Sequence, residues 1–176
     1  MALAVVLSAS VFTSCNKDDD PQPALEYKTE GSIKGKITGT SKDNAYTFND
    51  EFNYSQYSIL TGSYATYTVE TDGSYDFTIS RSDFATTSTA RLQFTLANAG
   101  STTPLDSDVT IQYIKEVDNK LVTFSMSSGG SNTTSITELT FDSSTGVIKG
   151  KYSLSGTNNS TTKSASVTGD FNVTAK

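Results

Sequence analysis

One cysteine and a set of carboxylates are the side chains of this sequence that could do chemistry, because the chain contains no histidine. The lack of histidine excludes Ser-His-Asp and Cys-His catalysis and histidine-based metal sites. The cysteine, Cys15, follows an apolar stretch at residues 2–12 and the small residues Thr13 and Ser14. Such a stretch suits the core of a signal peptide and is shorter than the ~20 residues of a membrane-spanning helix. We therefore predict a signal peptide at residues 1–14, cleavage before Cys15, and a lipid thioether on its thiol.

The residues on either side of Cys15 resemble a lipoprotein address of Bacteroidota. Thr13 and Ser14 before Cys15 are similar to the end of a lipobox. The residues after it resemble the lipoprotein export signal of that phylum; they are Lys17, Asp18, Asp19 and Asp20. The resemblance implies a lipoprotein on the outer face of the outer membrane. Residues 15–24 would then be a flexible acidic tether, and residues 25–176 the folded domain.

Two carboxylates near the middle of the chain, Asp106 and Asp108, are candidate calcium ligands. Oxygen ligands suit this hard cation, and we expect residues 99–108 to form a loop, although a complete site needs about six oxygens. Other carboxylates lie near aromatic residues, as in glycosidases. Because Asp72 is expected in a turn and Asp76 on a solvated strand face, we expect no enzyme activity. No cofactor other than calcium at Asp106 and Asp108 is expected.

The tyrosines are concentrated in one part of the chain. Six of the 9 tyrosines lie between residues 46 and 75, and tryptophan is absent. Tyrosine combines apolar area with a polar tip, which suits sugar or protein recognition. Tyr54, Tyr57 and Tyr64 are therefore our candidate exposed contacts with a ligand. The alternative is that these tyrosines lie at the rim of the fold with hydrated hydroxyls.

Alternating apolar and polar residues predict β-strands through most of the chain after residue 25. Turn-forming segments at residues 71–74, 118–120 and 142–146 separate the alternating segments. No amphipathic helix is evident. The pattern predicts an all-β fold, a single antiparallel sandwich or barrel of roughly nine strands. The alternating segments are residues 33–37, 75–79, 92–96, 109–113, 122–126, 139–141 and 167–173.

Three segments share an apolar-x-Gly-x-apolar pattern with the glycine on the inward face, at Gly35, Gly150 and Gly169. An inward glycine removes a side chain where a sheet must coil or accept a large neighbour. The region from residue 139 to residue 173 is also similar to the ending of a group of small, uncharacterised Bacteroidota lipoproteins. That resemblance implies an all-β surface lipoprotein and carries no established activity.

The formal net charge of -6 argues against nucleic acid as a partner. We expect contact with the membrane only through the lipid on Cys15. The first functional hypothesis is a non-enzymatic binding module for a glycan or a surface protein. The second is a structural envelope or appendage subunit that assembles by strand addition. The third is a β-barrel that binds a small apolar ligand in a cavity beside Gly35, Gly150 and Gly169.

Overall fold

The computed structural model describes residues 31–41, 46–56, 63–159 and 163–176. These residues form ten strands and no helix, which confirms the predicted all-β class. Within them, therefore, no helix is long and apolar enough to cross a membrane. The strands are β1 (Gly31–Thr40), β2 (Thr47–Tyr54), β3 (Ala65–Val69), β4 (Tyr75–Asp83), β5 (Ser88–Leu96), β6 (Asp106–Val117), β7 (Lys120–Ser127), β8 (Thr133–Asp142), β9 (Val147–Thr157) and β10 (Ser164–Thr174).

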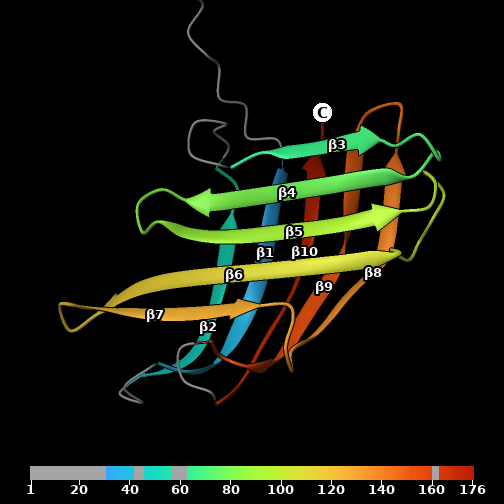
Figure 1. Cartoon of the computed structure of the whole chain (residues 1–176). Helices are drawn as coiled ribbons and strands as arrows, with labels where there is room; N and C mark the ends of the chain where they lie inside the picture. The colour runs from blue at the N-terminus through green and yellow to red at the C-terminus, as the bar shows by residue number, and fades with distance from the viewer. Residues whose placement is uncertain (1–30, 42–45, 57–62, 160–162) are drawn as a thin grey trace, which may run out of the picture.

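The ten strands form two five-stranded antiparallel sheets. Sheet A has the order β2-β1-β10-β9-β8, and sheet B has the order β3-β4-β5-β6-β7. Figure 1 shows the strands of sheet B running across those of sheet A, which lies behind it. Two sheets packed face to face with crossing strands form an orthogonal sandwich. Of the two predicted alternatives, the sandwich is the one adopted.

The alternating pattern places one apolar face of each sheet against the other. In β5, Leu92, Phe94 and Leu96 are buried, whereas Arg91, next to Leu92, is exposed. The ring of Phe94 lies 5.9 Å from that of Phe171 in sheet A. Because successive side chains of a strand point to opposite faces, the polar partners of this pattern form the outer faces of the sandwich.

The end of the chain ties the two sheets together. The backbone N–H of Ala175 donates to the carbonyl of Gly146 at 2.9 Å. The next N–H, of Lys176, donates to the carbonyl of Ala65 at 3.1 Å. Ala65 begins β3, the edge strand of sheet B, so the residues after β10 bridge from sheet A to that edge.

The predicted turns are present. Asp118 and Asn119 have φ angles of 50° and 60° and connect β6 to β7, as a type I′ hairpin requires. In the next predicted turn, the backbone N–H of Ser144 donates to Asp142 at 2.9 Å, and Gly146 has a φ of 74°. The Ser144 hydroxyl also donates to Asp142, and these bonds hold the pKa of that carboxyl below its ordinary value.

Aromatic side chains fill the space beside the three inward glycines. A Cβ at Gly35 would lie 2.7 Å from Cζ of Phe52, and one at Gly150 would lie 3.0 Å from Cζ of Phe171. A Cβ at Gly169 would lie 2.7 Å from the hydroxyl of Tyr152. The glycines therefore make room for large neighbours, as predicted. The hypothesis of a ligand cavity beside Gly35, Gly150 and Gly169 is wrong, because these rings occupy that space.

Two core tyrosines, Tyr54 and Tyr152, should resist ionisation until the protein unfolds. Burial raises the pKa of both phenols above the ordinary value of about 10. Unfolded chains release these protons near that pH, so these two phenols leave stability unchanged below about pH 10 and lower it as the pH rises further. In an alkaline titration, the tyrosinate absorbance of these two residues should therefore rise in one step, together with the loss of β-sheet circular dichroism.

The Tyr152→Phe variant provides the control for this titration, and its step should have a smaller amplitude. A smooth ionisation of all 9 tyrosines of the wild type while the circular dichroism persists would contradict the burial of these phenols.

Candidate functional site

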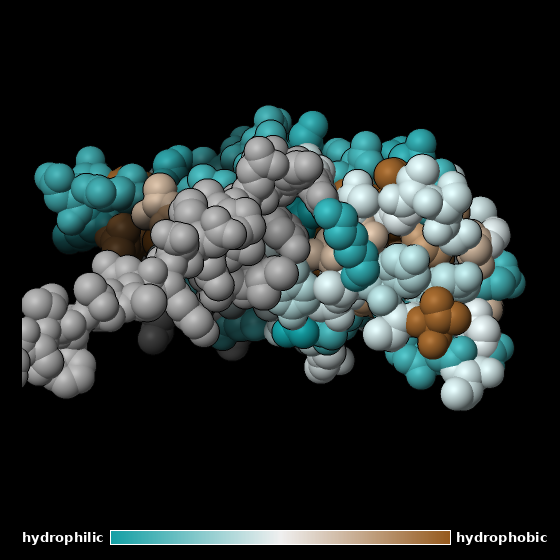
Figure 2. Space-filling model, turned by 90° about the horizontal axis from the view of Figure 1, so that it is seen from above, coloured by the Kyte–Doolittle hydropathy of each residue, from teal (hydrophilic) through white to brown (hydrophobic). Residues whose placement is uncertain are grey.

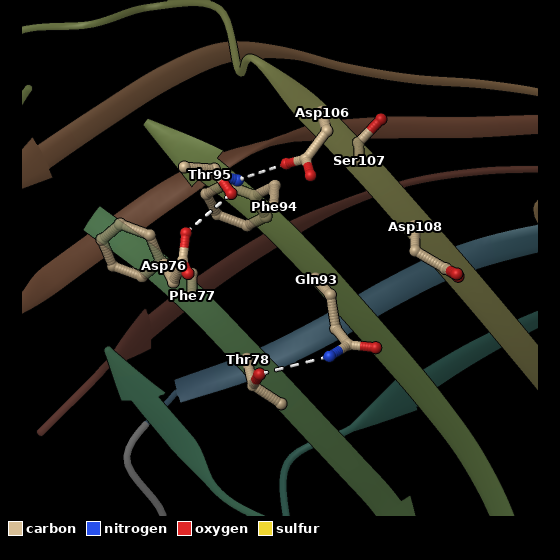
Figure 3. A pocket seen from close by; sticks show the side chains of 9 residues that line it. All are labelled: Asp76, Phe77, Thr78, Gln93, Phe94, Thr95, Asp106, Ser107 and Asp108. Atoms are coloured by element: carbon tan, nitrogen blue, oxygen red, sulfur yellow. Dashed lines mark hydrogen bonds between the residues drawn. The ribbon is translucent and has the colours of Figure 1, made fainter. Parts of the chain in front are cut away.

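A shallow depression of about 390 Å³ lies on the outer face of sheet B. It crosses strands β4, β5 and β6, and Figure 3 shows its side chains projecting from these three strands. Most of its lining residues are outward members of the alternating pattern, and Phe77 and Phe94, which also line it, are buried in the core. The polar lining residues are Asp76, Thr78, Gln93, Thr95, Asp106, Ser107 and Asp108.

The strand register arranges six of these side chains in two parallel rows. Asp76 pairs with Thr95, and Thr95 pairs with Asp106. In the second row, two residues away along each strand, Thr78 pairs with Gln93, and Gln93 pairs with Asp108. Neighbouring strands lie about 4.8 Å apart, and side chains two residues apart on one face are separated by about 7 Å. The site is therefore a flat array of hydrogen-bonding groups.

Hydrogen bonds within the first row fix two of its carboxylates. The hydroxyl of Thr95 donates to Oδ1 of Asp76 at 2.7 Å, and the backbone N–H of Thr95 donates to Oδ1 of Asp106 at 3.0 Å. Figure 3 shows both bonds converging on Thr95. Each carboxylate keeps a second oxygen that can accept a hydrogen bond from a ligand.

The second row is largely uncommitted. Nε2 of Gln93 lies 3.5 Å from the hydroxyl of Thr78, at the limit of a hydrogen bond. The carboxylate of Asp108 makes no hydrogen bond or ion pair with any described residue. An amide donor and a carboxylate acceptor are therefore available side by side on an open surface.

The calcium hypothesis gains no support from the positions of Asp106 and Asp108. Both residues lie at the start of strand β6 rather than in the predicted loop, which therefore ends before them. Among the described residues, no group of three His, Cys, Asp or Glu side chains is placed to hold a metal ion. The extended strand also spaces the Cα atoms of these two residues about 7 Å apart, unlike the ligands of a calcium-binding loop, which the loop gathers around the ion.

The prediction that Tyr54 is an exposed contact with a ligand is wrong. Tyr54 is only 4% exposed, and its ring stacks on that of Phe52 with a centroid separation of 4.6 Å. It shares the inward face of β2 with Phe52, so it belongs to the core. Tyr64 is half-buried beside the start of β3, and its carbonyl accepts a hydrogen bond from Ser80 at 2.7 Å. Tyr57 lies outside the described residues.

A second polar cluster links the two sheets and is satisfied internally. The ammonium of Lys115 in β6 lies 2.7 Å from Oδ1 of Asp50 in β2 and donates to the hydroxyl of Tyr46 at 2.8 Å. These hydrogen bonds, first that to Asp50, raise the pKa of Lys115. Because its donors and acceptors serve each other, we interpret this cluster as a tie between the sheets.

The polar array of sheet B was only partly foreseeable. From the sequence, Asp76 was predicted to face outward, and Asp106 and Asp108 were candidate calcium ligands. Gln93 and Thr95 were not among the candidate residues. Alternation marks those two as outward, but nothing in the sequence gives the register that brings the three strands together. The lipidation and export residues lie outside the described part of the chain; they are Cys15, Lys17, Asp18, Asp19 and Asp20.

Comparisons of the chain with protein-family models, with curated proteins and with solved structures found no match.

Proposed function

We propose that this protein is a lipid-anchored outer-membrane lipoprotein whose β domain binds a glycan at the cell surface without chemically altering it. The proposed address rests on Cys15 and on the lysine and aspartates that follow it. The proposed activity rests on one observation, the polar array on the outer face of sheet B, whose second row is largely uncommitted. Sugar hydroxyls both donate and accept hydrogen bonds, and this array offers them carboxylates, an amide and hydroxyls.

The shape of the site favours an extended ligand. Pockets for small molecules are concave and enclose most of the ligand surface. The depression on sheet B is instead open and shallow, and its two rows continue across three strands. A chain of sugars could lie along these rows and make repeated contacts with the same types of side chain. An open, hydrated face also lacks the apolar pocket that keeps a catalytic carboxylic acid protonated, so we propose binding alone.

A protein ligand is less well supported than a glycan. The centres of protein interfaces are apolar and contain aromatic anchors. On the face seen in Figure 2, the hydrophobic residues among those described form separate spots between hydrophilic ones. Among the residues that the structure describes, the large apolar side chains that are exposed belong to different strands and loops; they are Val69, Phe84, Leu105 and Leu121.

The sheet edges argue against assembly by strand addition. Native sheets protect their edges with bulges, short strands and covering segments. A bulge interrupts β8, where Glu138 has a φ of 52°. At β7, the carbonyl of Ser125 accepts a hydrogen bond from the backbone N–H of Asn159 at 2.9 Å. The five-residue edge strand β3 is bonded by Lys176 at Ala65. Three of the four edges are therefore obstructed.

Affinity electrophoresis of the purified full-length protein in gels containing dextran, mannan or xylan tests this function. We expect at least one of these neutral polysaccharides to retard the protein. The double variant Gln93→Ala/Asp108→Asn should weaken that binding about tenfold to a hundredfold, because hydrogen bonds to charged groups contribute about 1.5–3 kcal/mol.

The matched control for this experiment is Gln112→Ala/Glu116→Gln. It makes the same kinds of change on the outer face of β6, outside the depression. The control should bind like the wild type. Equal losses in the two double variants, or no retardation by any of the three polysaccharides, would contradict the proposed site.

A further inference from the structure

The outer face of sheet A carries a groove that runs across the strands. Two depressions of about 490 and 400 Å³ adjoin there and share Thr168, Gly169 and Asp170 of β10. The first extends over β1 and β2, and the second extends over β9 to Thr137 of β8. Together they cross all five strands of the sheet, on the opposite side of the sandwich from the polar array of sheet B.

The inward glycines explain why the sheet is hollowed here. Gly35 and Gly169 are paired in register on adjacent strands β1 and β10. The ring of Phe52 lies 2.7 Å from the position of a Cβ at Gly35, and the hydroxyl of Tyr152 lies 2.7 Å from that of a Cβ at Gly169. Both strands therefore lie closer to the core than a larger residue would allow. Glycine in a strand permits such a close approach and the accompanying curvature. The outer surface of sheet A is therefore recessed over this glycine pair.

Two lysines in the groove have uncommitted charges. Lys34 and Lys36 project from the outer face of β1 and are exposed. Neither forms an ion pair or a hydrogen bond through its ammonium with a described residue. A third lysine, Lys151 of β9, is paired with Glu138 at 2.7 Å. The ammonium groups of Lys34 and Lys36 are therefore available to an anion.

We propose that this groove binds an acidic polysaccharide whose carboxylates pair with Lys34 and Lys36. The two lysines lie two residues apart on one strand, about 7 Å at the Cα atoms. Their cross-strand neighbours are Asp170 and Glu51, which place negative charge beside them.

A polymer that carries both carboxylates and hydroxyl groups fits this mixed lining. Its acidic groups can meet the lysines, while its hydroxyls donate to Asp170 and Glu51 and exchange hydrogen bonds with Asn53 and Thr168. This groove and the array on sheet B share no residue, so the two sites are independent.

Binding of the full-length protein to polygalacturonate, measured by affinity electrophoresis, tests the groove. The wild type should be retarded, and retardation should weaken as salt is added, because the lysines are exposed. The variant Lys34→Gln/Lys36→Gln should lose about tenfold or more in affinity, as expected for two lost charge-assisted contacts. The control Lys120→Gln/Lys149→Gln removes the same net charge outside the groove and should change affinity less than about twofold.

Circular dichroism of both double variants should match the wild type, because all four lysines are exposed on strand surfaces. The proposal is overturned if polygalacturonate does not retard the wild type at low salt. It is also overturned if both double variants lose affinity equally, or if fully methyl-esterified polygalacturonate binds as well as the acid. Binding to phosphatidylglycerol vesicles without binding to polygalacturonate would likewise contradict it.

Discussion

Replacing Cys15 by alanine is expected to move the protein from the membrane fraction to the soluble fraction. The thiol is the only one in the chain, so no other residue can carry the lipid thioether. Stable anchoring requires more than one acyl chain, because a single myristoyl chain binds membranes only marginally. The net charge of -6 also gives the polypeptide no general attraction to anionic lipids. Fractionation of cells followed by detection of the protein measures this outcome.

A second variant separates anchoring from surface display. Alanine in place of Lys17, Asp18, Asp19 and Asp20 should leave the protein in the membrane fraction but facing the periplasm. Protease added to intact cells should then degrade the wild type and spare this variant. The lipoprotein proposal is contradicted if the Cys15→Ala variant stays in the membrane fraction. The export proposal is contradicted if protease added to intact cells still degrades the second variant.

Replacing Gly169 by alanine should destabilise the folded domain strongly. The added Cβ would collide with the backbone carbonyl of Lys34 and lie 2.8 Å from Cα of Gly35. Backbone atoms in a paired strand cannot move aside as the end of a flexible side chain can. Overpacking typically costs about 1–3 kcal/mol, and we expect a value at the upper end of that range. The corresponding fall in Tm, measured by thermal unfolding, is roughly 6–12 °C.

Gly100→Ala is the matched control for this substitution. The nearest atom to a Cβ at Gly100 is Oδ1 of Asn98 at 3.4 Å, an ordinary contact in an exposed turn. Its free energy of unfolding should change by less than about 0.5 kcal/mol. Equal Tm values for Gly169→Ala and Gly100→Ala would show that β1 and β10 do not approach each other as closely as described.

The strands and turns could be predicted because they depend on local sequence. Alternation alone placed Phe77 and Leu92 in the core and Asp76 outside, and all three assignments are correct. The two-residue turn at Asp118 and Asn119 was predictable because these residues tolerate a positive φ angle. The inward position of the glycines followed from the same alternation.

The positions of the candidate sites depend on pairing between distant strands, which local patterns do not determine. Asp76 and Asp106 come together only because β4 and β6 both pair with β5. The pairing of β1 with β10, which forms the groove on sheet A, joins opposite ends of the domain. The prediction that Tyr54 is exposed was wrong because Phe52 and Tyr54, two residues apart in β2, both point inward.

Glycan binding by sheet B is tested most directly by a ¹H–¹⁵N titration. The labelled protein is titrated with oligosaccharides prepared from whichever neutral polysaccharide retards it in gels. We expect saturable shifts for the amides of Thr78, Gln93, Thr95 and Asp108, with the oligosaccharide recovered intact. Shifts confined to other strands, or cleavage of the oligosaccharide, would contradict it.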